Sequence, residues 1–150
     1  MKALLAVLLL VVLIGRSEGA TSCPPTNPDS LGPFYKPNAP VRSILGSGYV
    51  LEGTVRSSVD CGKIPEARIE VWHAGPDGKY TDAYRATLIS DPEGQYQFHT
   101  ERPPRYSIQR PPHIHIQVTA PGYKTLITQH YPEKEASEAT FDLVLVPTKE

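Results

Sequence analysis

Basic side chains are not gathered into a patch anywhere in this chain, and its formal net charge at pH 7 is only −1. Nucleic-acid binding depends on such a patch, so we expect no nucleic-acid partner. Residues 21–150 also lack a Gly-rich phosphate loop, a G-x-S-x-G motif and a Cys-x-x-Cys pair. These absences argue against nucleotide binding, serine-hydrolase chemistry and a cysteine-ligated metal.

Long apolar runs are scarce, and the single one covers residues 3–14 at the N-terminus. It follows a basic start and precedes the small residues Gly19 and Ala20, as in a secretory signal peptide. The run is shorter than the roughly 20 residues of a membrane span, although a retained anchor is the alternative. We therefore predict a signal peptide over 1–20 and one domain over 21–150. The mature protein is expected to be secreted, extracellular or periplasmic, without membrane contact.

Cysteine is rare too, with only Cys23 and Cys61 in the whole chain. Both lie in the predicted mature part, where an oxidising compartment favours a disulfide over two free thiols. A bridge that closes a loop of about 40 residues would stabilise the fold by roughly 4 kcal/mol in the chain-entropy model.

No long segment of the mature chain has helical periodicity, whereas short apolar-rich segments recur between Pro, Gly and Asp turn signals. This pattern predicts a single all-β sandwich of about seven short strands, of transthyretin-like or immunoglobulin-like type. Residues up to Gly48 are expected to form an extended, proline-rich arm over it. The predicted strands are Tyr49–Arg56, Arg68–His73, Ala86–Ser90, Tyr96–Thr100, His113–Thr119, Thr125–Tyr131 and Thr140–Val146.

A His-x-His pattern lies within one predicted strand. Because strand side chains alternate between faces, His113, His115 and Gln117 share one face, and the intervening aliphatic residues can join the core. The two imidazoles start roughly 7 Å apart along the backbone and can turn onto one cation. The pattern therefore indicates a metal site, with a pair of surface histidines as the alternative.

Tyrosines favour one metal over another at this site. The chain has eight tyrosines, one of which, Tyr106, stands just before the histidines. A phenolate is a hard anionic donor that suits ferric iron, as tyrosinate ligation of haem iron illustrates. A site with two histidines, nearby tyrosines and no obvious carboxylate thus favours Fe(III), with zinc held by two histidines and water as the alternative.

The remaining candidates are expected to be structural. Asp82, Asp91 and Glu93 lie in turn-like contexts where solvated or capping roles are common, and no carboxylate is placed to complete a triad with Ser107. His73, His99 and His130 are expected to have structural or surface roles.

A series of short motifs spans most of the mature chain. In their order and spacing they resemble the intradiol ring-cleavage dioxygenases, the non-haem ferric enzymes that include catechol 1,2- and protocatechuate 3,4-dioxygenases. The motifs are Gly32–Tyr35, Ala39–Arg42, Gly53–Val55, Ile64–Ala67, Glu70–Ala74, Asp77–Tyr80, Asp91–Tyr96, Arg110–His115 and Leu126–Gln129.

The resemblance implies that the protein cleaves a catechol-type ring between its two hydroxyls with O2, which gives a muconate-type diacid. It implies that Arg110 closes the pocket over the ring and stabilises negative charge, while Gln129 lines the pocket. Tyr106 would leave the metal when substrate binds and accept a proton. The Fe(III) ligands carried over by motif are Tyr80, Tyr106, His113 and His115.

The chain departs from larger members of this family by lacking the helical N-terminal region that catechol-type members use to dimerise, which leaves the oligomeric state open. A different kind of protein is the alternative: a non-catalytic transthyretin-like module that binds carbohydrate or protein. A zinc hydrolase is a second and weaker alternative. A broad visible absorption from tyrosinate-to-iron charge transfer would distinguish the enzyme, since the other two would be colourless.

Overall fold

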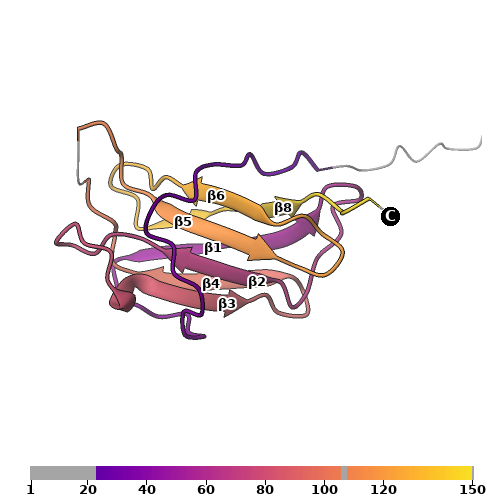
Figure 1. Ribbon diagram of the computed structural model, residues 1–150, viewed down its shortest axis with the longest axis horizontal. Coiled ribbons are helices and arrows are strands. Elements are labelled where there is room, and N and C mark those ends of the chain that lie inside the picture. Colours follow the sequence, from indigo (N-terminus) through magenta and orange to yellow (C-terminus); the bar gives the residue numbers. More distant parts are fainter. Residues whose placement is uncertain (1–22, 106–107, 150) are drawn as a thin grey trace, which may run out of the picture.

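The computed structural model describes residues 23–105 and 108–149, which form two stacked β-sheets (Figure 1). The predicted all-β sandwich is confirmed, and six of the seven predicted strands agree within one residue at either end. The predicted signal peptide, 1–20, lies outside the described residues. In the described part, no helix has the length and hydropathy of a membrane span.

The elements are β1 (Tyr49–Ser57), β2 (Arg68–Trp72), the 3₁₀ turn η1 (Asp82–Tyr84), β3 (Arg85–Ile89), β4 (Gln95–Thr100), β5 (Ile114–Thr119), β6 (Leu126–His130), β7 (Glu138–Thr140) and β8 (Leu143–Leu145).

The first sheet has the strand order β3-β2-β5-β6, and all its pairings are antiparallel. Its register places Trp72 of β2 opposite His115 of β5, and His115 opposite Gln129 of β6. Directly opposed residues point to the same face of a sheet, so these three side chains form a row across the outer face.

The second sheet has β1 between β4 on one side and β7 and β8 on the other. β7 pairs with Val50–Glu52, and β8 pairs with Val55–Ser57, both in parallel. The prediction of one continuous strand over Thr140–Val146 is therefore wrong, because the edge breaks between these two short strands.

The break has a side-chain cause. The carboxylate of Asp142 accepts hydrogen bonds from the Thr54 backbone N–H (2.9 Å) and from Nε of Arg56 (3.1 Å), which replaces a backbone pairing. Next to it the carbonyl of Phe141 approaches so closely that a Cβ on Gly53 would lie 2.2 Å away. Glycine is therefore required at position 53.

The core lies between the sheets and follows the predicted alternation. The three aliphatic residues of β5 are fully buried, whereas the intervening His115 points to the other face. Burial of such side chains stabilises the fold by roughly 2 kcal/mol each. The fully buried members include Tyr49, Leu51, Val55, Ile69, Phe98, Ile114, Ile116, Val118 and Leu143.

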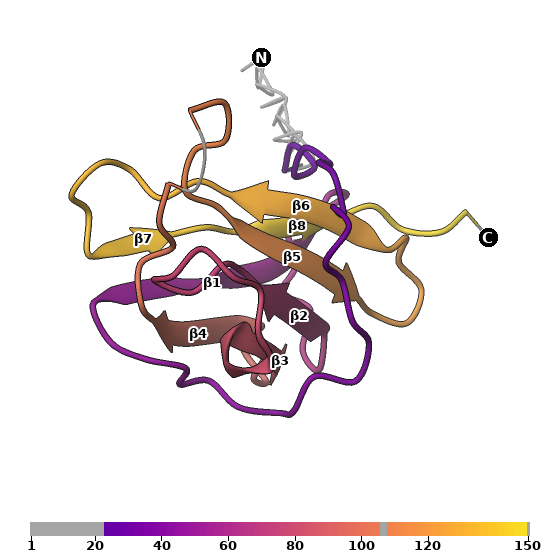
Figure 2. The ribbon, with the colours of Figure 1, turned by 60° about the vertical axis from the view of Figure 1, so that its left-hand side comes forward.

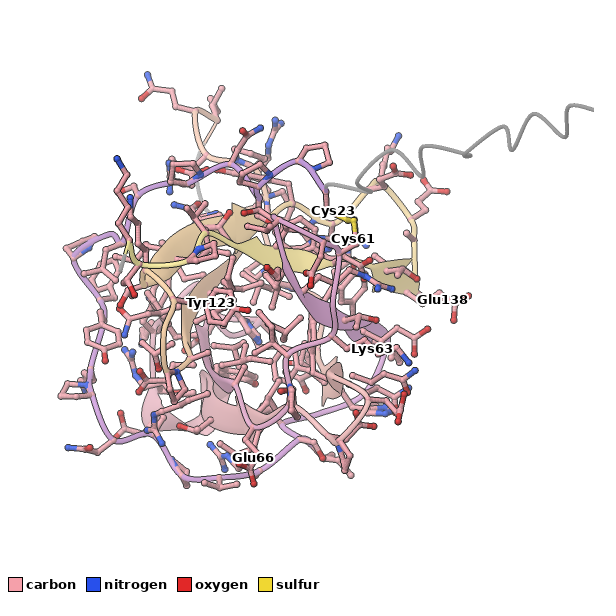
Figure 3. All side chains as sticks on the ribbon, turned by 90° about the vertical axis from the view of Figure 1, so that its right-hand side faces the viewer. Cys23, Cys61, Lys63, Glu66, Tyr123 and Glu138 are labelled. Carbon is pink, nitrogen blue, oxygen red and sulfur yellow. A yellow bond between two sulfur atoms is a disulfide. The ribbon has the colours of Figure 1, made fainter. Side chains whose placement is uncertain are left out.

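The predicted arm is confirmed over residues 23–48, and the Cys23–Cys61 disulfide fixes its start, with a Cα–Cα distance of 5.2 Å (Figure 3). From there the arm runs past β6, β5 and β2 towards β3 and β4 (Figure 2). Backbone hydrogen bonds attach it along this path: Asp29 N–H to Ile127 O, Arg42 N–H to Thr87 O, and Leu45 N–H to His99 O. The arm therefore lies across the sheet face that carries His115.

Candidate metal centre

Three donor atoms from two separate parts of the chain converge beside the first sheet. The phenol oxygen of Tyr80 lies 3.1 Å from Nε2 of His113 and 3.3 Å from Nε2 of His115. Donors that bind one metal at about 2.1 Å stand roughly 3 Å apart. The spacing and the chemistry of this donor set therefore fit a transition-metal ion held by one phenolate oxygen and two imidazole nitrogens.

The register of β5 and the arm together fix the ring of His115. Trp72 of the neighbouring strand stacks on it, with centroids 5.0 Å apart and planes only 2° from parallel. At the Cε1 edge of the imidazole, a Cβ on Gly32 would lie 2.8 Å away. Gly32 also has a φ of +70°, so a larger residue there would be strained and would displace the ring.

His113 is oriented by a carbonyl just before it. The Nδ1–H of its imidazole donates to the carbonyl oxygen of Pro111 at 2.7 Å, which fixes the tautomer. Nε2 then carries the lone pair and faces Tyr80. Metal-binding histidines are commonly oriented in this way through the nitrogen that does not bind the metal.

Burial keeps both imidazoles neutral. Burial, with a smaller contribution from the neighbouring His113, lowers the pKa of His115 to about 4. Burial also lowers the pKa of His113, and the Arg110 guanidinium acts in the same direction. Nδ1 of His115 is buried next to the backbone of Ser30 without forming a hydrogen bond of good geometry. Neutral imidazole is the form that binds metals.

The β2–β3 connection presents Tyr80. A tight turn directs the chain back towards the histidines. It is closed by a hydrogen bond from the Gly75 N–H to the Lys79 carbonyl at 2.9 Å. Gly75 packs against the ring of Tyr84, where a Cβ would lie 2.2 Å from the nearest ring carbon. Phe34 of the arm stacks on the Tyr80 ring at 4.4 Å and 19°, and thereby restricts its orientation.

Arg110 adds a positive charge at the edge of the donor cluster. One of its terminal nitrogens lies 3.4 Å from Nε2 of His113 and 3.4 Å from Oε1 of Gln129. Gln129 is buried and donates through Nε2 to the carbonyl of Ser30 at 2.7 Å. The cation is thus held within reach of a molecule bound at the cluster.

The structure brings together five predicted site residues, namely Tyr80, Arg110, His113, His115 and Gln129. The sixth, Tyr106, lies outside the described residues. In the described part, no group of three or more His, Cys, Asp or Glu side chains could hold a metal. Among the described residues, three protein ligands at the cluster would therefore have to include the phenol oxygen of Tyr80.

The residues expected to be structural have other partners. His73 is buried, donates to the Ala74 carbonyl at 2.8 Å and contacts the hydroxyl of Thr100 at 2.7 Å. The remaining contacts join His130 to Tyr49, His99 to Gln97, Asp82 to Lys36, Glu93 to Lys63, and Asp91 to the backbone of Glu93 and Gln95.

Sequence reasoning missed four residues that support the cluster. Phe34 and Trp72 belong to recognised motifs, yet nothing in their spacing indicates that they stack on Tyr80 and His115. Asp29 of the arm contacts Gln129 and Tyr131, which only the path of the arm reveals. Tyr131 could have been inferred from the sequence, because it follows Gln129 by two residues. Residues two apart in a strand point to the same face of the sheet.

Comparison with known proteins identifies the family. A family model described as "Dioxygenase" matches residues 42–144. A chlorocatechol 1,2-dioxygenase from Cupriavidus pinatubonensis is 33% identical over 77% of this chain and 55% of its own length. A hydroxyquinol 1,2-dioxygenase from Nocardioides simplex is 34% identical over 68% of this chain and 45% of its own length. The chain spans about half the length of the curated relatives it matches.

Solved structures agree. The dioxygenase domain of a dioxygenase–carbohydrate-binding fusion protein from Streptomyces sp. SirexAA-E superposes with a TM-score of 0.73 at 26% identity. That match covers 83% of this chain and 100% of the domain. Chlorocatechol 1,2-dioxygenase from Pseudomonas putida superposes with a TM-score of 0.69 at 26% identity, over 77% of this chain and 70% of that one. Fold, motifs and family match lead to one conclusion: the chain belongs to the intradiol ring-cleavage dioxygenase family.

Proposed function

We propose that this protein is an exported, iron-dependent dioxygenase that cleaves a catechol-type ring between its two hydroxyls. The observation that carries the proposal is the convergence of the Tyr80 oxygen with Nε2 of His113 and His115, within 3.1 and 3.3 Å. A phenol oxygen with two neutral imidazoles is a hard, partly anionic donor set that suits Fe(III) better than Zn²⁺. Curated relatives named catechol and chlorocatechol 1,2-dioxygenase support the same activity.

Tyr80, His113 and His115 would hold the iron, and Tyr106, four residues before Arg110, would supply a second tyrosinate. Ferric iron, when bound, supplies a Lewis acid that binds both oxygens of a catechol and renders the ring reactive towards O2. A catechol that binds as the dianion loses two protons, of which one would leave to solvent and the other would be accepted by a tyrosinate. We assign that role to Tyr106.

Arg110 would stabilise the negative charge that develops on the substrate ring. Its guanidinium lies 3.4 Å from Nε2 of His113, so a ring that binds beside this nitrogen comes within reach of a fixed cation. Charge that develops on the ring during oxygen insertion is stabilised by such a preorganised donor. Gln129 keeps the guanidinium in place through its Oε1.

The two alternative functions, a non-catalytic binding module and a zinc hydrolase, account less well for the side chains that converge at this site. A module that only binds carbohydrate or protein has no need for a phenol and two imidazoles to converge next to an arginine. A zinc hydrolase commonly uses a carboxylate as its general base, whereas Asp82, Asp91 and Glu93 are engaged with lysines or turn backbone.

The Cys23–Cys61 disulfide supports export, because disulfides persist in oxidising compartments. N-terminal sequencing of protein recovered outside the expressing cells tests the export part. The proposal expects a mature chain that begins after Gly19 or Ala20. Recovery of all the protein inside the cells, with Met1 retained, would refute it.

The activity is tested by supplying catechol and ¹⁸O₂ to the Fe(III)-loaded protein. The expected result is consumption of one O2 per ring and a muconate-type diacid that carries both labelled atoms. Resorcinol, with its hydroxyls in the 1,3 positions, is the matched substrate control and should not react. A product with one labelled atom, or no oxygen uptake at full iron loading, would contradict the proposal.

A further inference from the structure

A carboxylate of the arm and a phenol after β6 meet at Gln129. Oη of Tyr131 lies 2.8 Å from Oδ2 of Asp29 and 3.1 Å from Oε1 of Gln129. Nε2 of Gln129 lies 3.4 Å from Oδ1 of the same aspartate. The proposed function uses neither Asp29 nor Tyr131.

These contacts decide which way the Gln129 amide points. Its Nε2 faces two acceptors, the Ser30 carbonyl at 2.7 Å and the Asp29 carboxylate, and neither of these can donate a hydrogen bond. The amide oxygen must then face the opposite side, where it accepts from Arg110. The single proton of the Tyr131 hydroxyl is shared between the Asp29 carboxylate at 2.8 Å and this amide oxygen at 3.1 Å. A rotated amide would place two oxygens in contact at Ser30 and an N–H against the guanidinium.

The arm is attached on either side of this contact. The backbone N–H of Asp29 donates to the Ile127 carbonyl, and the Thr128 hydroxyl donates to the Asn27 carbonyl at 2.8 Å. These bonds hold Asp29 beside β6, the strand that carries Gln129. The Asp29 side chain is exposed, but the hydrogen bonds at Asn27 and Asp29 keep its carboxylate beside Gln129.

We propose that Asp29 and Tyr131 are positioning residues, which fix the Gln129 amide so that its oxygen holds the Arg110 guanidinium towards the substrate ring. The inference rests on the proposed function for its catalytic consequence. It adds that the arm, in addition to covering the sheet, sets the orientation of the cation. Without the pair, the amide can rotate and the guanidinium loses a fixed acceptor.

Tyr131→Phe and Asp29→Asn test this proposal, since the first removes the hydroxyl and the second replaces the carboxylate by a neutral amide, each with little change of shape. In Fe(III)-loaded protein, both should retain the iron content and the visible spectrum of the wild type. The kcat for catechol should fall about tenfold while KM changes less than about twofold, because a misplaced group acts on the transition state. Tyr123→Phe is the matched control. Tyr123 lies in the turn after β5, at the other end of that strand from the histidines, and its hydroxyl bonds to no other described residue.

A double-mutant comparison separates positioning from a general structural effect. In an Arg110→Ala background, Tyr131→Phe should cause no further loss of the residual kcat, because its action passes through Arg110. An equal tenfold loss in both backgrounds, or an unchanged kcat in Tyr131→Phe alone, would overturn the proposal.

A second measurement needs no turnover. The urea midpoints of Asp29→Asn, Tyr131→Phe and the double variant should be non-additive, with the double variant little worse than the single ones. Additive shifts of the urea midpoint would show that Asp29 and Tyr131 do not act together, and would overturn the proposal even if the enzyme is active. If wild-type protein at full iron loading fails to cleave catechol, the proposed function fails, and the urea comparison still decides whether the pair exists.

Discussion

The phenol oxygen of Tyr80 lies 3.1 Å from Nε2 of His113, although 33 residues separate them in the chain. His115 completes the set at 3.3 Å from the same oxygen. The β2–β3 turn brings the tyrosine in from one side, and the start of β5 presents the histidines from the other. The site therefore depends on the placement of the β2–β3 connection relative to the start of β5.

Tyr80→Phe should lower the iron content of the purified protein sharply and weaken its visible absorption, because the variant lacks one of the donor oxygens. Metal analysis after ferric reconstitution measures the first effect. Tyr84→Phe is the control from the same connection, since its hydroxyl donates to Glu101 at 2.5 Å. Full iron content and an unchanged spectrum in Tyr80→Phe would remove this residue from the site.

His115→Ala should lower the affinity for iron by more than about tenfold, since removing even an outer-shell partner of a metal ligand costs 10- to 100-fold. His99→Ala removes a histidine that contacts Gln97 on the second sheet and should bind iron like the wild type. Equal iron affinity in the two variants, measured by competition with a chelator, would contradict the assignment of His115.

Arg110→Ala should keep its iron and lose about 10²-fold or more in kcat, because it removes a preorganised cation that acts on developing charge. Lys79→Ala is the control for general electrostatics, as its exposed cation stands next to Tyr80 in the chain. Steady-state kinetics with catechol compares the two. An Arg110→Ala enzyme with wild-type turnover would show that the charge-stabilising role is wrong.

Acid should destabilise the fold through two buried histidines outside the cluster. Burial lowers the pKa of His73 and of His130 to about 4. The unfolded chain takes up their protons below about pH 6.5, whereas the folded chain does so only below about 4. Their stabilising contribution is thus complete above pH 6.5 and is lost as the pH falls from there to 4.

Between pH 7 and pH 5, each of these histidines should lower the free energy of unfolding by about 2 kcal/mol. Urea unfolding of wild type and His130→Gln at both pH values measures the share of His130. The variant should show the smaller decrease. An identical pH dependence in both proteins would mean that His130 does not stay neutral in the fold.

Removal of the disulfide by a double Cys23→Ser and Cys61→Ser change should lower the free energy of unfolding by about 4 kcal/mol in the chain-entropy model. Urea unfolding of the oxidised wild type and the double variant measures this difference. Reduced wild-type protein should behave like the variant. Equal stability of all three would show that the bridge does not restrain the unfolded chain.

Residue periodicity predicts the sandwich well, because alternation of buried and exposed side chains is a local property of each strand. The face shared by His113 and His115 follows from the same rule. One strand prediction failed at Asp142, whose side chain takes over a backbone pairing through contact with Thr54, a residue distant in sequence. Such a break leaves no local signal.

The donor set was less accessible from the residues alone. Tyr80, Tyr84 and Tyr96 have similar local contexts, and the family motif was needed to choose among them. The fold separates them clearly: Tyr84 bonds to Glu101, and Tyr96 is buried with its hydroxyl on the Phe141 carbonyl. The contacts of the arm with the site depend on its path across the sheet, which composition does not determine.

The visible spectrum of purified, iron-loaded mature protein, recorded before and after catechol is added without oxygen, tests the central claim most directly. The account predicts a broad charge-transfer absorption from tyrosinate bound to Fe(III), which shifts when catechol binds at the open positions. A protein that stays colourless after ferric reconstitution, or a band that catechol leaves unchanged, would contradict it.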